Sequence, residues 1–277
     1  MIGVNTFGLT RKIEEDMSGT FRTVREAGFD AVELLVVPVK KHRRGLPVAF
    51  SAEDMFHKVM AQVRACGLRV PSVHVFCSTG HSLRPVKSIV RTIRELHTRH
   101  GIDTFVFSGM FRDAKGARKW ARYLKSIADE VREDDCKILY HNHTQEFCKI
   151  RVAGTITTAL DYFFDLVGED VLLQLDIGWA GVADDELALA QHYQSRIVSI
   201  HLKDFAAGTK GKYDNFSMPT ERFAAIGCGE IRTAEVLAMR DLLPKFNGSV
   251  IIDQDNSTGD MLDDIRTGLI NVKEMLK

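Results

Sequence analysis

Four short apolar runs in this sequence end in side chains that bind metals or move protons in proteins. The runs are KILYHNHTQEF, LLQLDIGW, VSIHLKD and VIIDQDNS, and they supply His141, His143 and Glu146, then Asp176, then His201, Lys203 and Asp204, and last Asp253 and Asp255. Carboxylates that converge inside a protein repel one another and are costly to remove from water. A divalent cation removes that cost. An imidazole with three carboxylates suits Mn²⁺, Mg²⁺, Co²⁺ or Zn²⁺ and leaves positions open for substrate.

Strand alternation relates some of these side chains to one another, because every second residue of a strand points to the same side. His201 and Lys203 therefore share a face of their strand. Asp253 and Asp255 also share a face, so alternation leaves both as candidates. A single strand-end aspartate is more often structural than a ligand. The pattern on four successive runs is what favours a metal site.

The elements that must position these side chains alternate regularly along the chain. Most of the β-branched, apolar runs recur about every 25 to 40 residues, which fits one strand and one helix. The eight runs are IGVNTF, DAVELLVV, VPSVHVF, DTFVFSG, KILYHNH, VLLQLDIG, IVSIHLKD and SVIIDQD. The intervals have helical periodicity. From Ile13 to Ala27, for example, Met17, Phe21 and Val24 share one face, and Gly28 follows as a C-terminal cap.

Eight strands that alternate with helices predict a parallel sheet, either open and doubly wound or closed into a barrel. An open sheet that binds dinucleotides carries GxGxxG after its first strand, and NTFGLT lacks that pattern. The even spacing and the 277-residue length favour a single-domain (β/α)8 TIM barrel over residues 1–277. In such a barrel the active site lies at the C-terminal ends of the strands, where the polar runs end.

Other side chains near the predicted strand ends are candidates for substrate contacts. Glu33 and His74 lie in the second and third runs, and Trp179 follows Asp176. His143 and Lys203 are placed to bond substrate hydroxyls, or else to orient the metal ligands. Glu33 and His74 fit core packing as well as a cavity wall, and Trp179 fits either a wall for a sugar ring or helix packing.

Composition narrows the classes of partner. Lysine and arginine balance aspartate and glutamate, so the net charge is zero and gives no general attraction to nucleic acid or anionic membranes. The sequence has no apolar run of membrane-spanning length and no secretory leader at its start. Its five cysteines form no CxxC pair. A cytoplasmic protein with free thiols is the expectation, with no nucleic-acid or membrane partner.

Together, YHNHTQEF, LQLDIGWA, SIHLKDF and VIIDQDNS resemble the xylose isomerase-like TIM-barrel superfamily, and within it the sugar phosphate isomerases/epimerases. The resemblance covers nearly the whole chain. It implies one divalent metal ion, with Mn²⁺ the first expectation, held by Glu146, Asp176, His201 and Asp253. Asp253 stands where the family usually has glutamate, which puts a mechanism with paired glutamates in doubt. The superfamily's DNA-repair endonucleases need further histidines that this chain lacks.

The resemblance also implies the reaction. Glu146 or Asp253 would remove a proton next to the carbonyl of a sugar or polyol, and the metal would stabilise the enediolate. Reprotonation would give an isomer or an epimer. The alternatives are a lyase that expels a β-hydroxyl from the same enediolate, as in inosose dehydratases, and a non-catalytic sugar-binding barrel. Homo-oligomers are common in the family.

A long glycine-containing segment from Phe205 to Gly229 is expected to form a loop over the barrel mouth and to act as a lid. Lys210 and Lys212 in it would suit a phosphate, although loop lysines are more often solvated.

Overall fold

The computed structural model describes residues 1–41, 48, 50–79 and 82–277. Eight parallel strands form a closed ring, because the first strand pairs with both the second and the last. In ring order the strands are β1 (Ile2–Asn5), β2 (Ala31–Val36), β4 (Val73–Val75), β7 (Thr104–Phe107), β8 (Lys137–His141), β11 (Leu172–Asp176), β12 (Ile197–Leu202) and β15 (Ser249–Ile252). The predicted (β/α)8 barrel is confirmed, and each of the eight sequence runs contributes one strand.

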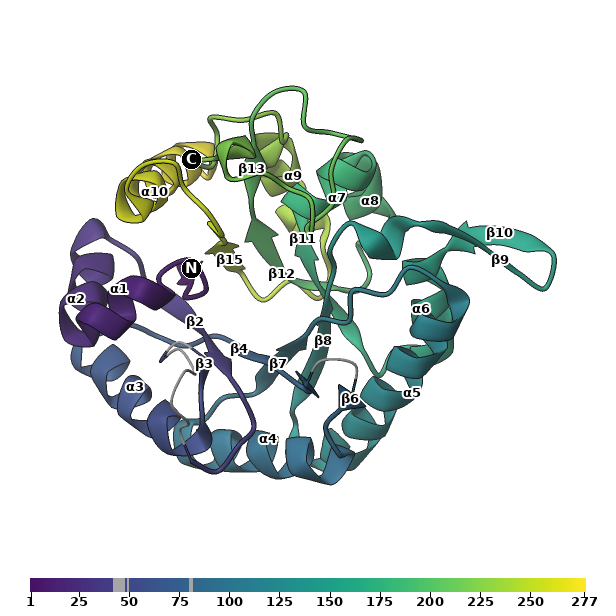
Figure 1. Ribbon diagram of the computed structural model, residues 1–277, viewed down its shortest axis with the longest axis horizontal. Helices are drawn as coiled ribbons and strands as arrows, with labels where there is room; N and C mark the ends of the chain where they lie inside the picture. Colours follow the sequence, from purple (N-terminus) through teal and green to yellow (C-terminus); the bar gives the residue numbers. More distant parts are fainter. Residues whose placement is uncertain (42–47, 49, 80–81) are drawn as a thin grey trace.

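Helices surround this ring on the outside (Figure 1). They are α1 (Thr10–Glu15), α2 (Met17–Ala27), α3 (Glu53–Ala65), α4 (Val86–His100), α5 (Ala114–Val131), α6 (Ala159–Val167), α7 (Ile177–Ala183), α8 (Glu186–His192), α9 (Thr233–Ala238) and α10 (Met261–Met275). Short 3-10 turns are η1 (Arg132–Asp134), η2 (Gln145–Phe147), η3 (Thr220–Arg222) and η4 (Arg240–Leu242). No helix in these described segments has both the length and the apolar character needed to cross a bilayer.

The first helical segment differs from its prediction. The expected single helix over Ile13–Ala27 is split at Asp16, whose backbone is extended. The Asp16 side chain accepts a hydrogen bond from the Gly19 N–H and so caps the start of α2. Gly28 ends α2 in the left-handed conformation with φ of 100°, as predicted. A capping side chain therefore restarts the helix where apolar spacing alone suggested continuity.

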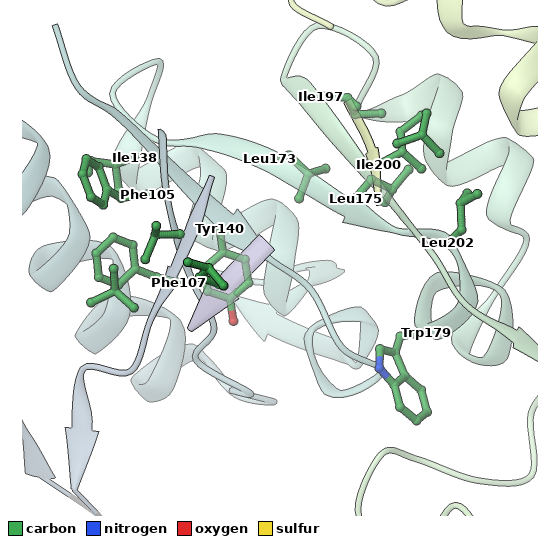
Figure 2. Close-up of a cluster of buried hydrophobic side chains, with 14 of the residues drawn as sticks. Phe105, Phe107, Ile138, Tyr140, Leu173, Leu175, Trp179, Ile197, Ile200 and Leu202 are labelled. Carbon is green, nitrogen blue, oxygen red and sulfur yellow. The ribbon is translucent and has the colours of Figure 1, made fainter. Parts of the chain in front are cut away.

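The two faces of the barrel strands pack into separate cores. Phe105, Phe107, Ile138, Tyr140, Leu173, Leu175, Ile200 and Leu202 belong to the large core cluster, and Figure 2 shows several of these side chains along neighbouring strands. Residues of the other parity, Val106, Leu139 and Val198, form a small cluster of their own. The barrel interior thus has little apolar filling, and the space toward the C-terminal strand ends is left to polar side chains.

Shorter strands decorate the ring. They are β3 (Phe50–Ser51), β5 (Ser78–Thr79), β6 (Ser82–Leu83), β9 (Lys149–Val152), β10 (Thr155–Thr158), β13 (Asp204–Phe205) and β14 (Phe223–Ala224). The β9–β10 hairpin projects from the barrel (Figure 1). The predicted loop from Phe205 to Gly229 contains the antiparallel pair β13–β14. Lys210 of this loop bonds the buried carboxylate of Glu186, which ties the loop to the start of α8.

Candidate metal centre

Four buried side chains meet at the C-terminal ends of adjacent strands: His141, Asp176, His201 and Asp253. One nitrogen or carboxylate oxygen from each lies within 4.8 Å of all the others. The parallel register sets Asp176 level with His201 on neighbouring strands, and Asp253 directly follows β15. Two imidazoles and two carboxylates are a donor set that suits Mn²⁺, Zn²⁺ or Co²⁺. The cluster suggests a divalent metal site, as the sequence predicted.

Asp176 presents a buried oxygen that has no hydrogen-bond partner. Its Oδ1 accepts from the Trp179 N–H at 2.8 Å and caps α7. Its Oδ2 is buried without a partner, 3.8 Å from both His141 Nε2 and Lys203 Nζ. Burial raises the pKa of Asp176 to about 7. A buried carboxylate oxygen near a histidine nitrogen that accepts no hydrogen bond is typical of a ligand atom that a cation would satisfy. The residues present therefore fit a cation.

His201 lies between two carboxylates. Its Nδ1 is 3.2 Å from Asp253 Oδ2, and its Nε2 is 3.0 Å from Glu33 Oε1. Burial alone would lower the pKa of His201, but the two negative charges outweigh that effect and raise the pKa to about 10. Histidines that bind metals commonly donate their second N–H to a carboxylate, which fixes the ring. The Glu33–His201 contact has this form.

Glu33 is held inside the barrel by four donors. Oε1 accepts from Asn5 Nδ2 at 2.9 Å and from His201, and Oε2 accepts from Ser72 Oγ at 2.5 Å and Gln174 Nε2 at 2.7 Å. Burial would raise the pKa of Glu33, but His201 and the hydrogen bonds hold it well below the usual range. Glu33 does not line the cavity described below. The structure thus places Glu33 in contact with His201 of the cluster, and a direct substrate contact by Glu33 stays a prediction.

Lys203 brings a positive charge to the same strand ends. Its Nζ donates to Asp253 Oδ2 at 2.9 Å and to Asp255 Oδ2 at 2.5 Å. Burial works against the charged amine, yet the carboxylates of Asp253, Asp255 and Asp176 raise the pKa of Lys203 above its ordinary value. The alternation argument left Asp253 and Asp255 open. In the structure Asp253 joins the cluster, and Asp255 pairs with Lys203 at its edge.

Glu146 lies outside the cluster. It sits on the turn η2 after β8, where Tyr140 Oη donates to its Oε1 and the His143 N–H donates to its Oε2 at 3.0 Å. Burial raises the pKa of Glu146 to about 7. Glu146 is not among the cavity residues, and His141 takes the fourth place in the cluster. The turn directs this carboxylate back toward Tyr140, which spacing along the sequence did not reveal.

A cavity of about 440 Å³ opens above the cluster. The residues that line it include five predicted site residues: His74, His143, Trp179, Lys203 and Asp253. His74 Nε2 lies 2.9 Å from Ser108 Oγ. His143 Nδ1 and Trp179 Nε1 are buried without partners, and the two rings stack at 6.2 Å between centroids. These two nitrogens are free to bond a substrate hydroxyl, and the substrate contacts of His143 and Trp179 stay predictions.

Several lining residues were not singled out by the sequence argument. His141 stood among the strand-end candidates, but the ligand set was completed with Glu146. Ser108, Met110 and the loop residues Asn215 and Phe216 also line the cavity. Ser108 lies within the run DTFVFSG and Met110 directly follows it, so the sequence placed both near a strand end. Asn215 and Phe216 carry no comparable signal.

Comparison with known proteins identifies the class. The family model described as xylose isomerase-like TIM barrel matches residues 21–269, and the chain belongs to that family. No curated protein matches it.

Solved structures share the fold at low identity. A sugar phosphate isomerase/epimerase from Parabacteroides distasonis has a TM-score of 0.75 and 16% identity, covering 98% of this chain and 95% of that one. A probable 3-DHS dehydratase from Bacillus anthracis has a TM-score of 0.71 and 9% identity, covering 98% of each chain. A xylose isomerase-like TIM-barrel protein from Mycobacterium smegmatis in complex with magnesium has a TM-score of 0.69 and 12% identity, covering 99% and 96%.

Proposed function

We propose that this chain is a divalent-metal-dependent sugar isomerase or epimerase that acts by removing a proton next to a carbonyl. The observation that carries the proposal is the buried cluster of His141, Asp176, His201 and Asp253, two of which, His141 and Asp253, line the cavity, with the Asp176 Oδ2 left without a partner. The family membership and the isomerase/epimerase among the similar structures support it.

The proposed ligands are the four residues of the cluster, so His141 replaces Glu146 in the set expected from the sequence. Glu33 would orient His201 through its Nε2–H. When bound, a divalent cation would polarise the substrate carbonyl as a Lewis acid and stabilise the negative charge of the enediolate. Mn²⁺ remains the first candidate, and Mg²⁺, Co²⁺ and Zn²⁺ are the others.

The proton transfers are assigned to residues that reach the cavity. Asp253 lines it and is the proposed base. Lys203, held by Asp253 and Asp255, would donate a hydrogen bond to a substrate oxygen and neutralise charge that develops there. His143 and Trp179 would bond the hydroxyls farther along the substrate. Glu146, predicted as a base, accepts hydrogen bonds at both oxygens, from Tyr140 and from the His143 N–H, so in this proposal it supports the fold of the β8 turn instead.

A lyase is the second candidate, and one feature favours it. Lys203 is the cation on the cavity floor, next to the proposed base, which suits protonation of a departing β-hydroxyl. The dehydratase among the similar structures agrees with this possibility. A non-catalytic sugar-binding barrel would bind the metal and the sugar without turnover.

The test is deuterium exchange followed by NMR. Metal-loaded protein is incubated in D2O with ketoses, aldoses and inososes. Exchange next to a carbonyl that chelator abolishes supports the proposal, and the products separate an isomer or epimer from a dehydrated ketone. Metal-loaded protein that exchanges no proton of any of these compounds contradicts the isomerase proposal and favours the binding role.

A further inference from the structure

The two ends of the cavity differ in polarity. Its floor is formed by His141, Lys203 and Asp253, all of them buried. Its rim is formed by large apolar side chains: Phe7 is 42% exposed, Met110 39% and Phe216 74%. Seven large hydrophobic residues are exposed in the described part of the chain, and these three of them line this one cavity. Exposed apolar surface is therefore concentrated at the mouth of the candidate active site.

The rim residues come from three separate loops. Phe7 follows β1, Met110 follows β7, and Phe216 lies in the loop between β13 and β14. Met218 and Phe223, which are less exposed, continue the apolar wall inward from Phe216. Side chains far apart in the sequence thus form one apolar surface, which we call the aromatic rim and define as Phe7, Met110, Phe216, Met218 and Phe223.

The exposed position of Phe216 is fixed by hydrogen bonds. The Asp214 side chain accepts from the Phe216 N–H at 3.0 Å and from the Ser217 N–H at 2.9 Å. The neighbouring Asn215 donates to Met110 Sδ at 3.1 Å, and its Oδ1 accepts from Thr144 Oγ1 at 3.4 Å. These bonds tie the loop to two other strand-end loops across the cavity. Specific hydrogen bonds therefore hold Phe216 in its exposed position at the rim.

The hydroxyl groups of a bare sugar do not match this surface. Hydroxyl groups placed against the rim would lose water without gaining hydrogen bonds, which is unfavourable. A flat apolar group would cover the rings and gain from leaving water. The cavity volume of about 440 Å³ falls in the range of about 300 to 1,000 Å³ that accommodates drug-sized ligands, so a sugar with a further group fits.

We propose that the substrate is a sugar derivative that carries both a carbonyl group and an aryl group, such as an aryl glycoside of a keto-sugar: the sugar lies on the polar floor and the aryl group lies against the aromatic rim. The sugar half of this inference rests on the proposed function. The aryl half rests on the position and exposure of the rim residues alone.

The test compares matched pairs of probes. Methyl and phenyl glycosides of glucose, galactose and mannose are titrated into the metal-loaded protein, and binding is followed by saturation-transfer NMR, which reports separately on sugar and phenyl protons. At least one phenyl glycoside is expected to bind about tenfold or more tightly than its methyl partner, since burial of an added apolar group in a fitted site is worth that much. Saturation should reach the phenyl protons.

Two variants locate the contact. Phe216→Ser should bring the phenyl glycoside to within about threefold of the methyl glycoside. Ile156→Ser is the matched control, because Ile156 is another exposed hydrophobic residue and does not line the cavity. It should keep the full preference. Equal affinity for both members of every pair, no binding of any phenyl glycoside, or a preference that survives Phe216→Ser would overturn the inference. Self-association of the unliganded wild type that Phe216→Ser abolishes would also overturn it, in favour of an interface between two copies.

The outcomes separate this inference from the proposed function. A phenyl preference without proton exchange on any sugar leaves the aryl site standing and removes the isomerase chemistry. Exchange on free sugars without a phenyl preference does the reverse.

Discussion

Replacing Glu33 with glutamine tests whether the residue beneath the cluster positions a metal ligand. Both Glu33 oxygens accept two hydrogen bonds each, and the carboxylate is fully buried. An amide offers one oxygen and one NH2 group, so its NH2 would face either Asn5 and His201 or Ser72 and Gln174. Ser72 can rotate its hydroxyl to accept a hydrogen bond from the new NH2 group. The NH2 groups of Asn5 and Gln174 cannot accept one, and one of them faces the new NH2 group in either orientation. At least one buried donor therefore loses its partner.

The size of the effect follows from these contacts. One unsatisfied buried polar group costs about 1 to 3 kcal/mol of unfolding free energy. Loss of the carboxylate that fixes a metal-binding histidine reduces metal affinity by about 10- to 100-fold. Glu33→Gln is therefore expected to fold with lower stability and to bind Mn²⁺ about 10- to 100-fold more weakly, measured by calorimetric titration and urea unfolding.

Glu53→Gln is the matched control for this experiment. Glu53 is also a buried glutamate, and it accepts from Thr92 Oγ1 at 2.5 Å away from the cluster. Its replacement should lower stability and leave metal affinity unchanged. Wild-type metal affinity in Glu33→Gln, or an equal loss of affinity in Glu53→Gln, would refute the positioning role of Glu33.

Three further predictions concern the fold around the site. Burial raises the pKa of Glu146 from 4.5 to about 7, so the folded protein holds a proton on Glu146 that is lost as pH rises through 7. Relative to Glu146→Gln, the wild type should therefore lose about 3 kcal/mol of unfolding free energy between pH 4.5 and pH 8, measured by urea unfolding. A difference between the two proteins that does not change with pH would contradict this pKa. Asp16→Ala removes the cap of α2 and should cost about 1 kcal/mol, with Asp16→Asn retaining most of it in the same assay. Leu139→Ala opens the small cluster inside the barrel and should cost about 2 to 5 kcal/mol by chemical unfolding; a smaller loss would mean that the interior collapses around the cavity.

Much of the barrel could be predicted from the sequence, because its strands and helices follow from local sequence patterns. β-Branched runs predict the strands, and glycine with left-handed backbone at Gly28 ends its helix as expected. The helix split at Asp16 was missed because apolar periodicity continues across a residue whose side chain caps the next turn. The local sequence pattern thus predicts the presence of a helix or strand more reliably than the residue at which it begins.

Three of the four residues in the candidate cluster could be expected from the sequence, and the physical reason is again local pattern. Asp176, His201 and Asp253 lie at or next to the C-terminal ends of adjacent strands, so the parallel register brings them together. Glu146 lies beyond the strand end, where the direction of the chain depends on a turn and on the Tyr140 hydroxyl. Glu33, for which the sequence left core packing and a cavity wall both open, is buried and contacts His201. The direction of a side chain on a strand follows from strand alternation. The direction of a side chain on a turn depends on tertiary contacts that cannot be derived from sequence spacing.

The aromatic rim could not be predicted from the sequence, because it also depends on tertiary structure. Phe7, Met110 and Phe216 are far apart in the chain and follow no periodicity. Only the closure of the ring brings their loops together, and Asn215 then joins two of those loops.

The most direct test of the account is metal binding by the cluster. Protein stripped with chelator is titrated with Mn²⁺ and followed by electron paramagnetic resonance, for the wild type, Asp176→Asn and Asp255→Asn. Asparagine at position 176 retains the Oδ1 that caps α7, so the fold should persist. The account predicts one Mn²⁺ per chain in the wild type, retention in Asp255→Asn and loss of at least about 100-fold in affinity in Asp176→Asn. A wild type that binds no Mn²⁺, Mg²⁺, Co²⁺ or Zn²⁺, or an Asp176→Asn variant that binds as tightly as the wild type, would contradict it.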